Sequence, residues 1–290
     1  KKKTLRLGDL LHLDKPHIQS RLKTMLEYKN LELGGCYHQA PMSYPALLSW
    51  CEKKAEQFAP YITDTGNYIA ADLSNHQKVV LEAQLGAMRD IDYGIFPYTS
   101  SSSTISAYGP IGAGIPGTLP DHIVGVLKAY STCVGAGPFT AEKAMPEKWM
   151  ESLRKSGGEY GAATGRPRRV GPFDAVASAY GLKCQNADKI ALTKLDVLSH
   201  MDEIPVITSY KLNDEIITEF DPLDDLDSMT PVTQMLPGWN TDISKCRKYE
   251  ELPENARKYI ETLEHLLNHE IQFISVGAER NQYLTKGEWL

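Results

Sequence analysis

The sequence predicts an α/β fold in which a mostly parallel sheet is flanked by helices. Short apolar runs typical of buried strands alternate along the chain with segments whose apolar residues recur at helical spacing. The chain has 290 residues, which is enough for one large α/β domain. Its 42% hydrophobic and 23% charged residues are ordinary values for a globular protein. We therefore expect residues 1–290 to form a single domain.

Residues 1–77 are predicted to be mainly helical. Asp14 is expected to cap a helix that carries Pro16 in its first turn, because proline needs no N–H bond there. Apolar residues then recur at helical spacing on one face from Ile18 to Leu26. A second helical pattern covers residues 47–58.

The pattern changes from residue 78 onward. Val79–Leu81 is short and apolar, as in a buried strand. Residues 92–120 are rich in Ser, Gly, Pro and Tyr and predict a long loop, a feature that is usually functional or disordered. Asp121–Leu127 has a helical pattern, and Ala129–Val134 reads as a strand that ends in a glycine-rich turn.

The remaining chain continues the alternation of helices and strands. Residues 157–172 form a loop rich in glycine and arginine. No internal repeat and no low-complexity segment interrupts the pattern. We expect helices at 147–155, 173–180 and 253–268, and strands at 190–192, 206–210, 216–220 and 272–275.

Charge and cysteine usage exclude several classes of protein. The net charge is -6 and the only basic run, Lys1–Lys3, is short, which argues against a nucleic-acid partner. The five cysteines are widely spaced and form no C-x-x-C pair, a pattern typical of a reducing cytoplasm. No apolar run reaches the length of a membrane span, so we expect no membrane partner.

A first chemical motif, Thr193–Asp196, follows an apolar strand, where open α/β sheets bind ligands. The carboxylate of Asp196 can accept two hydrogen bonds from the N1–H and the exocyclic amine of guanine. Adenine offers no such donor pair, so the arrangement selects guanine. The stem of Lys194 can lie along the base while its ammonium stays in water. The motif alone also fits a solvated Lys–Asp pair at a strand end.

A second motif is the sequence GAATGRPRRVG at residues 161–171. Three arginines lie on a loop that glycines allow to bend, and arginine binds carboxylates and phosphates in a forked geometry. The loop is therefore expected to hold an anionic substrate and to close over it. The alternative is an exposed basic loop without a ligand.

Several segments together resemble the adenylosuccinate synthetases. The resemblance extends from about Leu5 to about Arg280, and its blocks occur in the order found in that family. These blocks are RDIDYGIFPYTSSSS (89–103), LKAYSTCVGAGPF (127–139), GEYGAATGRPRRVGPFD (158–174), ALTKLDVL (191–198) and MLPGW (235–239).

The resemblance implies a P-loop-NTPase-like fold and a GTP-dependent ligase of purine biosynthesis. In that family the γ-phosphoryl group of GTP is placed on O6 of IMP, and the amino group of L-aspartate then displaces phosphate to give adenylosuccinate and GDP. Such chemistry consists mainly of positioning anions and neutralising charge. The resemblance also implies Mg²⁺, a homodimer and a cytoplasmic enzyme, with residues 78–290 binding nucleotide and substrate.

The resemblance implies roles for individual residues. It places Arg168, Lys194, Leu195, Asp196, Ser275, Val276 and Gly277 at GTP. It places Gln84, Ser100, Val134, Gly135 and Arg166 at IMP, where Gln84 is preferred over Leu85 because only an amide can hydrogen-bond a phosphate. It places Ala162, Ala163, Thr164, Gly165, Arg166, Pro167 and Arg168 at aspartate.

The sequence also departs from the family. Ala163 replaces a common threonine, Cys133 stands where arginine is common, and Pro172 stands where tryptophan is common. The glycine-rich GDEGKGK loop, its catalytic aspartate and the following catalytic histidine have no counterpart here. We therefore expect the catalytic residues and the Mg²⁺ ligands to lie outside this chain, which alone should be inactive. Arg6, and Lys2 in place of an arginine, are candidates for the family's basic segment at the subunit interface.

Two other functions are compatible with these departures. One is a noncatalytic guanine-nucleotide-binding relative, and the other is a phage-type enzyme that uses dGMP in place of IMP. His265 and His269 lie four residues apart on a predicted helix, but no third metal ligand accompanies them. Cys133 has no histidine partner that would make it a nucleophile.

Overall fold

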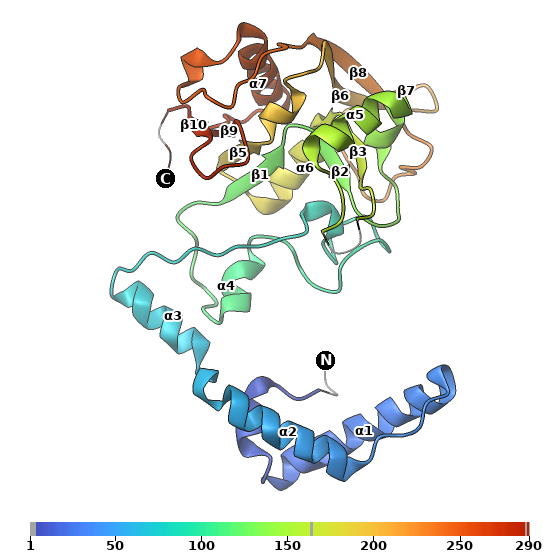
Figure 1. Ribbon diagram of the computed structural model, residues 1–290, viewed down its shortest axis with the longest axis vertical. Coiled ribbons are helices and arrows are strands. Elements are labelled where there is room, and N and C mark those ends of the chain that lie inside the picture. The colour runs from blue at the N-terminus through green and yellow to red at the C-terminus, as the bar shows by residue number, and fades with distance from the viewer. Residues whose placement is uncertain (1–3, 163–164, 288, 290) are drawn as a thin grey trace. The chain divides into compact units, whose positions relative to one another are not determined.

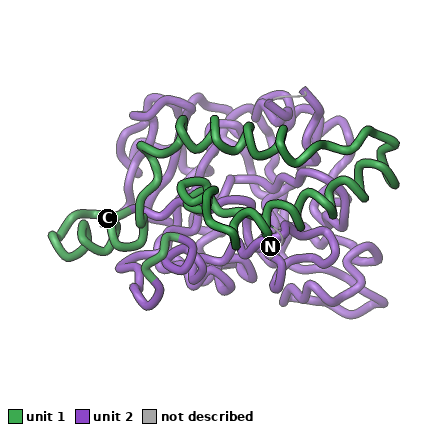
Figure 2. Tube along the Cα trace, turned by 90° about the horizontal axis from the view of Figure 1, so that it is seen from below, with its two compact units in different colours: residues 1–79, 113–115 green, residues 80–112, 116–290 purple. Residues whose placement is uncertain are grey.

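The computed structural model describes residues 4–162, 165–287 and 289. The basic run at residues 1–3, which includes Lys2, lies outside these residues, as do Ala163 and Thr164. The chain divides into two compact units (Figure 2). Unit 1 comprises Lys1–Val79 and Ala113–Ile115, and unit 2 comprises Val80–Gly112 and Pro116–Leu290.

Unit 1 is helical throughout its described secondary structure (Figure 1). As predicted, a proline stands in the first turn of its first long helix. The predicted cap at Asp14 is wrong by one residue, since Lys15 occupies the cap position and its side chain makes no capping bond. A small core contains Leu13, Ile18, Leu22 and Cys51. The elements are a 3₁₀ helix at Leu7–His12, α1 (Pro16–Tyr37), α2 (Tyr44–Phe58), a 3₁₀ turn at Ala59–Tyr61 and α3 (Thr65–Ser74).

The first sheet of unit 2 has the strand order β1-β5-β9-β10. Its first three strands are parallel, and β10 runs antiparallel to β9. Lys128 pairs with Thr193, and Leu192 pairs with Ile274, so the carboxyl ends of β1, β5 and β9 meet at one edge. The bounds are β1 (Val124–Lys128), β5 (Lys189–Thr193), β9 (Phe273–Ser275) and β10 (Tyr283–Thr285).

The second sheet is built around the long strand β6 (Glu203–Leu212). It pairs in parallel with β4 and antiparallel with β7 and β8. The α/β class is thus confirmed, while the parallel order holds mainly in the first sheet. A separate antiparallel pair joins β2 to β3. The bounds are β2 (Ser131–Cys133), β3 (Arg169–Gly171), β4 (Phe173–Asp174), β7 (Glu215–Ile217) and β8 (Thr230–Pro237).

Helices pack on these sheets around one main hydrophobic core. Helix α6 packs against α7, β6 and β1, and α5 packs against β3 (Figure 1). The core includes the fully buried Leu192, Tyr259 and Ile274. The helices are α4 (Tyr108–Ala113), α5 (Glu147–Gly157), α6 (Ala175–Gln185) and α7 (Glu254–Leu267), with 3₁₀ turns at Ala87–Arg89, Thr140–Lys143, Leu195–Leu198 and Tyr249–Glu251.

Two further predictions from local pattern are wrong. Val79–Leu81 forms no strand, and Val80 is 89% exposed. Asp121–Leu127 is not a helix, because its second half is β1. The β-branched Val124 and Val126 favour a strand, and pairing with β5 outweighs the helical pattern. The remaining differences are smaller: α4 lies inside the predicted loop at 92–120, β3 lies inside the one at 157–172, β4 precedes α6, and α3, β8 and β10 were not predicted.

Candidate functional site

The predicted guanine-binding residues come together at the carboxyl ends of β5 and β9. Lys194 follows β5 in the left-handed conformation, with a φ of 61°, and begins the turn that carries Asp196. Ser275 is the last residue of the neighbouring strand β9. Since β5 and β9 are parallel and paired in register, the two segments lie at one sheet edge. Leu195 and Val276 are fully buried, so only their backbone groups can face a ligand.

Asp196 presents a carboxylate at this edge. Desolvation raises the pKa of Asp196, its own backbone amide and the positive charge of Lys194 lower it, and the negative charge of Asp242 raises it. Among the described residues no side chain donates a hydrogen bond to this half-buried carboxylate. The two oxygens can therefore accept a pair of donors from a ligand.

A tight turn follows β9 at Ser275–Gly277. The Ser275 hydroxyl donates to the carbonyl oxygen of Gly277 at 3.0 Å. A Cβ atom on Gly277 would lie 2.3 Å from Oε1 of Gln282, so no larger residue fits without moving that side chain. Glycine thus keeps the chain close to the end of β9.

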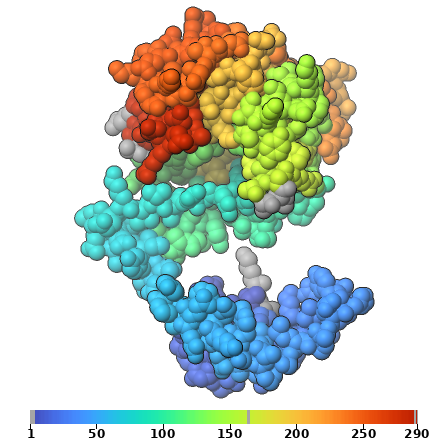
Figure 3. Space-filling view, in the orientation of Figure 1, coloured from blue at the N-terminus to red at the C-terminus, as the bar shows by residue number. Residues whose placement is uncertain are grey.

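The arginine-rich loop is closed by backbone hydrogen bonds. The amide of Gly161 donates to the carbonyl of Arg166 at 2.8 Å, and the amide of Gly165 donates to the carbonyl of Gly161 at 2.8 Å. Gly165 has a φ of 65°, which favours glycine. The described predicted residues Ala162, Gly165, Arg166 and Pro167 are exposed. Figure 3 shows the yellow-green segment of this region at the surface of unit 2.

Glu159 binds the base of this loop and was not predicted as a site residue. Its side chain is 0% exposed. Oε2 accepts a hydrogen bond from Nη1 of Arg168 at 2.8 Å. Oε1 accepts from Nζ of Lys128 at 2.8 Å, the Tyr130 hydroxyl at 2.7 Å and Nζ of Lys194 at 3.3 Å. This cluster joins the predicted GTP residues Arg168 and Lys194.

The charges around Glu159 decide its protonation. Burial alone would raise the pKa of this carboxyl, but hydrogen bonds from Lys128, Tyr130 and Arg168 together lower the pKa to about 2. Glu159 is therefore ionised at neutral pH. With Lys128, Arg168 and Lys194 beside one carboxylate, the cluster carries two excess positive charges.

The third arginine of the loop, Arg169, has a structural role. Its guanidinium binds Glu142 through Nε at 2.6 Å and also through Nη2. Nη1 donates to the carbonyl of Gly137 at 2.7 Å. Arg169 thus holds the turn after β2, and Arg166 and Arg168 stay the predicted residues for binding an anion.

The predicted IMP residues Ser100 and Val134 are joined through Arg89, while the carbonyl of Gly135 accepts from Nη1 of Arg169 at 3.3 Å. Nη2 of Arg89 donates to the Val134 carbonyl at 3.0 Å, and the backbone carbonyl of Arg89 accepts from the Ser100 amide at 2.8 Å. Gly135 has a φ of 88°, which favours glycine. Gln84 is exposed, and among the described residues no hydrogen bond joins it to the other three.

Two departures from the family have a structural context. Nη2 of Arg89 lies 2.8 Å from Sγ of Cys133, so a guanidinium reaches the position where the family commonly has an arginine side chain. Pro172 is buried between β3 and β4. Ala163 lies outside the described residues.

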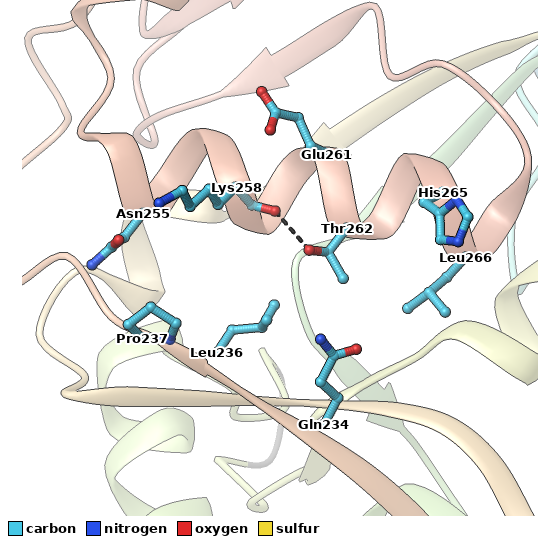
Figure 4. Close-up of a pocket in the computed structure, with 9 residues that line it drawn as sticks. All are labelled: Gln234, Leu236, Pro237, Asn255, Lys258, Glu261, Thr262, His265 and Leu266. Atoms are coloured by element: carbon cyan, nitrogen blue, oxygen red, sulfur yellow. Dashed lines mark hydrogen bonds between the residues drawn. The ribbon is translucent and has the colours of Figure 1, made fainter.

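Open grooves occur among the described residues of unit 2. One of about 420 Å³ is lined by Pro167, Arg168 and Arg169 together with α5 residues, and it adjoins the arginine-rich loop. Another of about 430 Å³ lies between β8 and α7 and contains none of the predicted site residues (Figure 4). His265 lines the latter groove. In the described part of the chain no group of three or more His, Cys, Asp or Glu residues could hold a metal ion.

Among the described residues, no helix combines the length and the apolar character that crossing a membrane would require.

The chain is similar to proteins of known family. A family model described as adenylosuccinate synthetase matches residues 1–284. The chain is 40% identical to the adenylosuccinate synthetase of Carboxydothermus hydrogenoformans and 39% identical to that of Geotalea daltonii, each over 279 residues. Both alignments cover 96% of this chain and 64% of the relative, so the chain spans about two-thirds of the length of these proteins.

A solved structure is similar as well. The fully ligated adenylosuccinate synthetase of Plasmodium falciparum matches with a TM-score of 0.86 and 32% identity. The match covers 98% of this chain and 66% of that one.

Proposed function

Because the chain belongs to the adenylosuccinate synthetase family, we propose that it supplies the guanine, the aspartate and part of the IMP recognition of a GTP-dependent ligase. The reaction transfers the γ-phosphoryl group of GTP to O6 of IMP. The amine of L-aspartate then displaces phosphate and forms adenylosuccinate.

One observation carries the proposal: the half-buried carboxylate of Asp196 faces no donor among the described side chains at the sheet edge where β5 and β9 end. Guanine offers two adjacent donors that such a carboxylate can accept, whereas adenine would leave it unpaired. A buried polar group without its partner costs about 1–3 kcal/mol, which favours the correct base.

The cationic cluster supports binding of anions beside the base. Lys128, Arg168 and Lys194 have side chains that are 28%, 34% and 38% exposed, so each can still be reached by a ligand. Arg166 lies two residues before Arg168 on the same loop, which would let two guanidinium groups approach the two carboxylates of aspartate.

Mg²⁺ is implied by the family, but the described residues do not fit it. No suitable ligand group occurs among them, and the side chains near Asp196 and Glu159 are mainly cationic. We therefore derive no step of the reaction through a metal ion held by these residues.

A homodimer and a cytoplasmic setting belong to the same proposal. Light scattering of the purified protein would test the dimer, since a monomer at all concentrations contradicts it.

The experiment compares the full reading frame that contains the chain with the chain alone. Adenylosuccinate formation is followed by absorbance with IMP, GTP and L-aspartate, and dGMP is tested in parallel. GDP and ADP binding to the chain alone is measured by calorimetry. We expect ligase activity in the full protein and a preference for GDP over ADP in the chain.

Each other outcome favours a different function. Product with dGMP but not IMP would identify the phage-type reaction. Tight GDP binding without product in either protein would favour a noncatalytic nucleotide-binding relative. No preference between GDP and ADP would remove Asp196 from the site.

A further inference from the structure

Glu159 lies where three segments of unit 2 meet. It follows α5, which ends at Gly157 and is capped by Gly158 in the left-handed conformation. Lys128 ends β1, Lys194 follows β5, and Arg168 precedes β3. A single buried side chain thus contacts the ends of two parallel strands and the base of the arginine-rich loop.

The close packing around Glu159 leaves its carboxylate little freedom. Its amide donates to the carbonyl of Arg154 at 2.9 Å, and its carbonyl accepts from the amide of Arg168 at 2.9 Å. A Cβ atom on Gly157 would lie 2.4 Å from the Tyr130 hydroxyl, which itself donates to Glu159. The backbone on both sides is therefore fixed as well as the side chain.

Each cation of the cluster is paired with this carboxylate, although Lys194 also donates to the carbonyl of Gly157 at 2.6 Å and Lys128 to the hydroxyl of Thr132 at 3.1 Å. Without the carboxylate, Lys128, Lys194 and Arg168 would repel one another, since like charges at this separation in a partly buried site are unfavourable. Their long side chains would then turn toward water, because a charged group has a lower free energy in water than in a partly buried position without a partner.

We propose that Glu159 is a positioning residue that holds Lys194 of the guanine site and Arg168 of the aspartate-binding loop in their binding orientations. The inference rests on the proposed function. Glu159 contacts no substrate itself: it acts through the two cations, and so it couples the binding of GTP to the binding of aspartate. The IMP residues Ser100 and Val134, which bond to Arg89, do not share this carboxylate.

The test measures KM for each substrate in the full protein and Kd for GDP in the chain. Glu159→Gln keeps the shape of the side chain but removes its charge. We expect KM for GTP and KM for aspartate to rise at least about tenfold each, as for the loss of a charged hydrogen-bond partner, with KM for IMP within about twofold of the native value. Glu159→Asp, which retains the charge, should recover part of both losses.

The matched control is Glu264→Gln. Glu264 is also a largely buried carboxylate paired with a lysine, Lys286, at 2.6 Å, but it lies near the amino end of β9, away from the site. We expect this variant to lower the melting temperature and to leave all three KM values unchanged.

Tyr130→Phe provides a second variant should Glu159→Gln fail to fold. It removes only the hydroxyl that donates to Oε1 of Glu159. We expect KM for GTP and KM for aspartate to rise about threefold, as for a lost neutral donor to a charged group.

The outcomes separate the two proposals. Wild-type protein without ligase activity and without GDP binding would overturn the proposed function and this inference together. If the wild-type protein is active but the Glu159 variant keeps native KM values for GTP and aspartate, only the positioning role is overturned. Equal increases in all three KM values, or a loss of kcat alone, would also contradict it, since a general structural defect has that effect.

Discussion

At the scale of single residues, the proposed site distinguishes bases by the number of hydrogen-bond donors that each base presents to Asp196. The Asp196 carboxylate has two acceptor oxygens and no described side-chain donor of its own. Burial raises the pKa of Asp196, which shows that ionisation is costly unless a ligand supplies hydrogen bonds. Guanine supplies two hydrogen bonds. They therefore stabilise binding more at this partly buried sheet edge than they would on an open surface.

Asp196→Asn should change which nucleotide binds best. Asparagine presents an amide donor where the carboxylate accepted, so it conflicts with the exocyclic amine of guanine and complements the carbonyl oxygen that xanthine has there. We expect the ratio of XDP to GDP affinity in the chain to rise at least about tenfold, from one lost and one gained hydrogen bond. Calorimetry with both nucleotides measures it.

Asp242→Asn is the control for this substitution. Asp242 raises the pKa of Asp196 through its charge, but its own carboxylate accepts from the backbone of Ser244. The variant should leave the preference for GDP intact. If Asp196→Asn has the same ratio of XDP to GDP affinity as the native protein, Asp196 does not recognise the base.

Contiguous motifs were the part of the site that the sequence could predict. Lys194 and Asp196 stand two residues apart, and the structure keeps both at one strand end. Glu159 was missed because its partners Lys128 and Lys194 are 31 and 35 residues away in the sequence. The only signal was its position inside the segment GEYGAATGRPRR, where an acidic residue precedes the arginines.

At the scale of secondary structure elements, helix α6 begins at a buried acid. Asp174 caps the helix by accepting from the amide of Ala177 at 3.0 Å, and it also accepts from the Tyr210 hydroxyl at 2.7 Å. Burial raises the pKa of Asp174 to about 6, despite these hydrogen bonds, which lower it. The ordinary pKa of an aspartate side chain, which we take for the unfolded chain, is 3.8.

The raised pKa predicts how stability depends on pH. Between about pH 4 and about pH 6 the folded state binds the proton of Asp174 more tightly than the unfolded state, so the free energy of unfolding falls as pH rises. The loss amounts to about 3 kcal/mol for a shift of this size. Asp174→Asn cannot ionise, and its carbonyl oxygen can still cap α6.

Urea unfolding of both proteins at several pH values checks this prediction. We expect the variant to gain up to about 3 kcal/mol relative to native protein between about pH 4 and about pH 7. Contributions of other groups, including Glu159 at lower pH, are common to both proteins and cancel in the difference. Parallel pH profiles would show that Asp174 titrates normally.

The turn after β8 depends on a glycine for a different reason. A Cβ atom on Gly238 would lie 1.7 Å from the carbonyl oxygen of Met201, which is backbone and has little room to move. The Gly238 amide also donates to the carbonyl of Asp202 at 2.7 Å. We expect Gly238→Ala to reduce the free energy of unfolding by at least about 2 kcal/mol through overpacking.

Gly34→Ala serves as the matched control. Gly34 lies in α1 with nothing within 4 Å of an added Cβ atom, so alanine should stabilise the helix by about 0.5–1 kcal/mol. Chemical denaturation of the two variants measures both effects. A small loss in Gly238→Ala would mean that the turn relaxes away from Met201.

At the scale of the whole molecule, the sequence predicted the class of fold better than the arrangement of sheets. The alternation of apolar runs and helical patterns indicates α/β, but it does not separate β5 from β6 into two sheets. Strand β8 was missed because its residues are largely exposed or half-buried and give no apolar run. Its place is fixed by antiparallel pairing along β6, a contact that local pattern does not encode.

The two units differ in the size of their cores, and this predicts how they exchange amide hydrogens. Among the described residues of unit 1 the core cluster is Leu13, Ile18, Leu22 and Cys51, whereas the core of unit 2 joins two sheets to α6 and α7. Local opening is easier where few apolar side chains are buried. We expect amides of α1 and α2 to exchange much faster than those of β5 and α7 in dilute protein, as measured by mass spectrometry.

Protein concentration should change the result if the proposed homodimer forms through unit 1. Leu31, Trp50 and Tyr61 are 73%, 57% and 78% exposed, and burial of such side chains favours association. Protection of α1 and α2 should then rise with concentration, while that of β5 stays constant. Fast exchange of α1 and α2 at every concentration would place the dimer interface elsewhere. Uniform protection of both units in dilute protein would contradict the prediction that the small core makes unit 1 exchange faster.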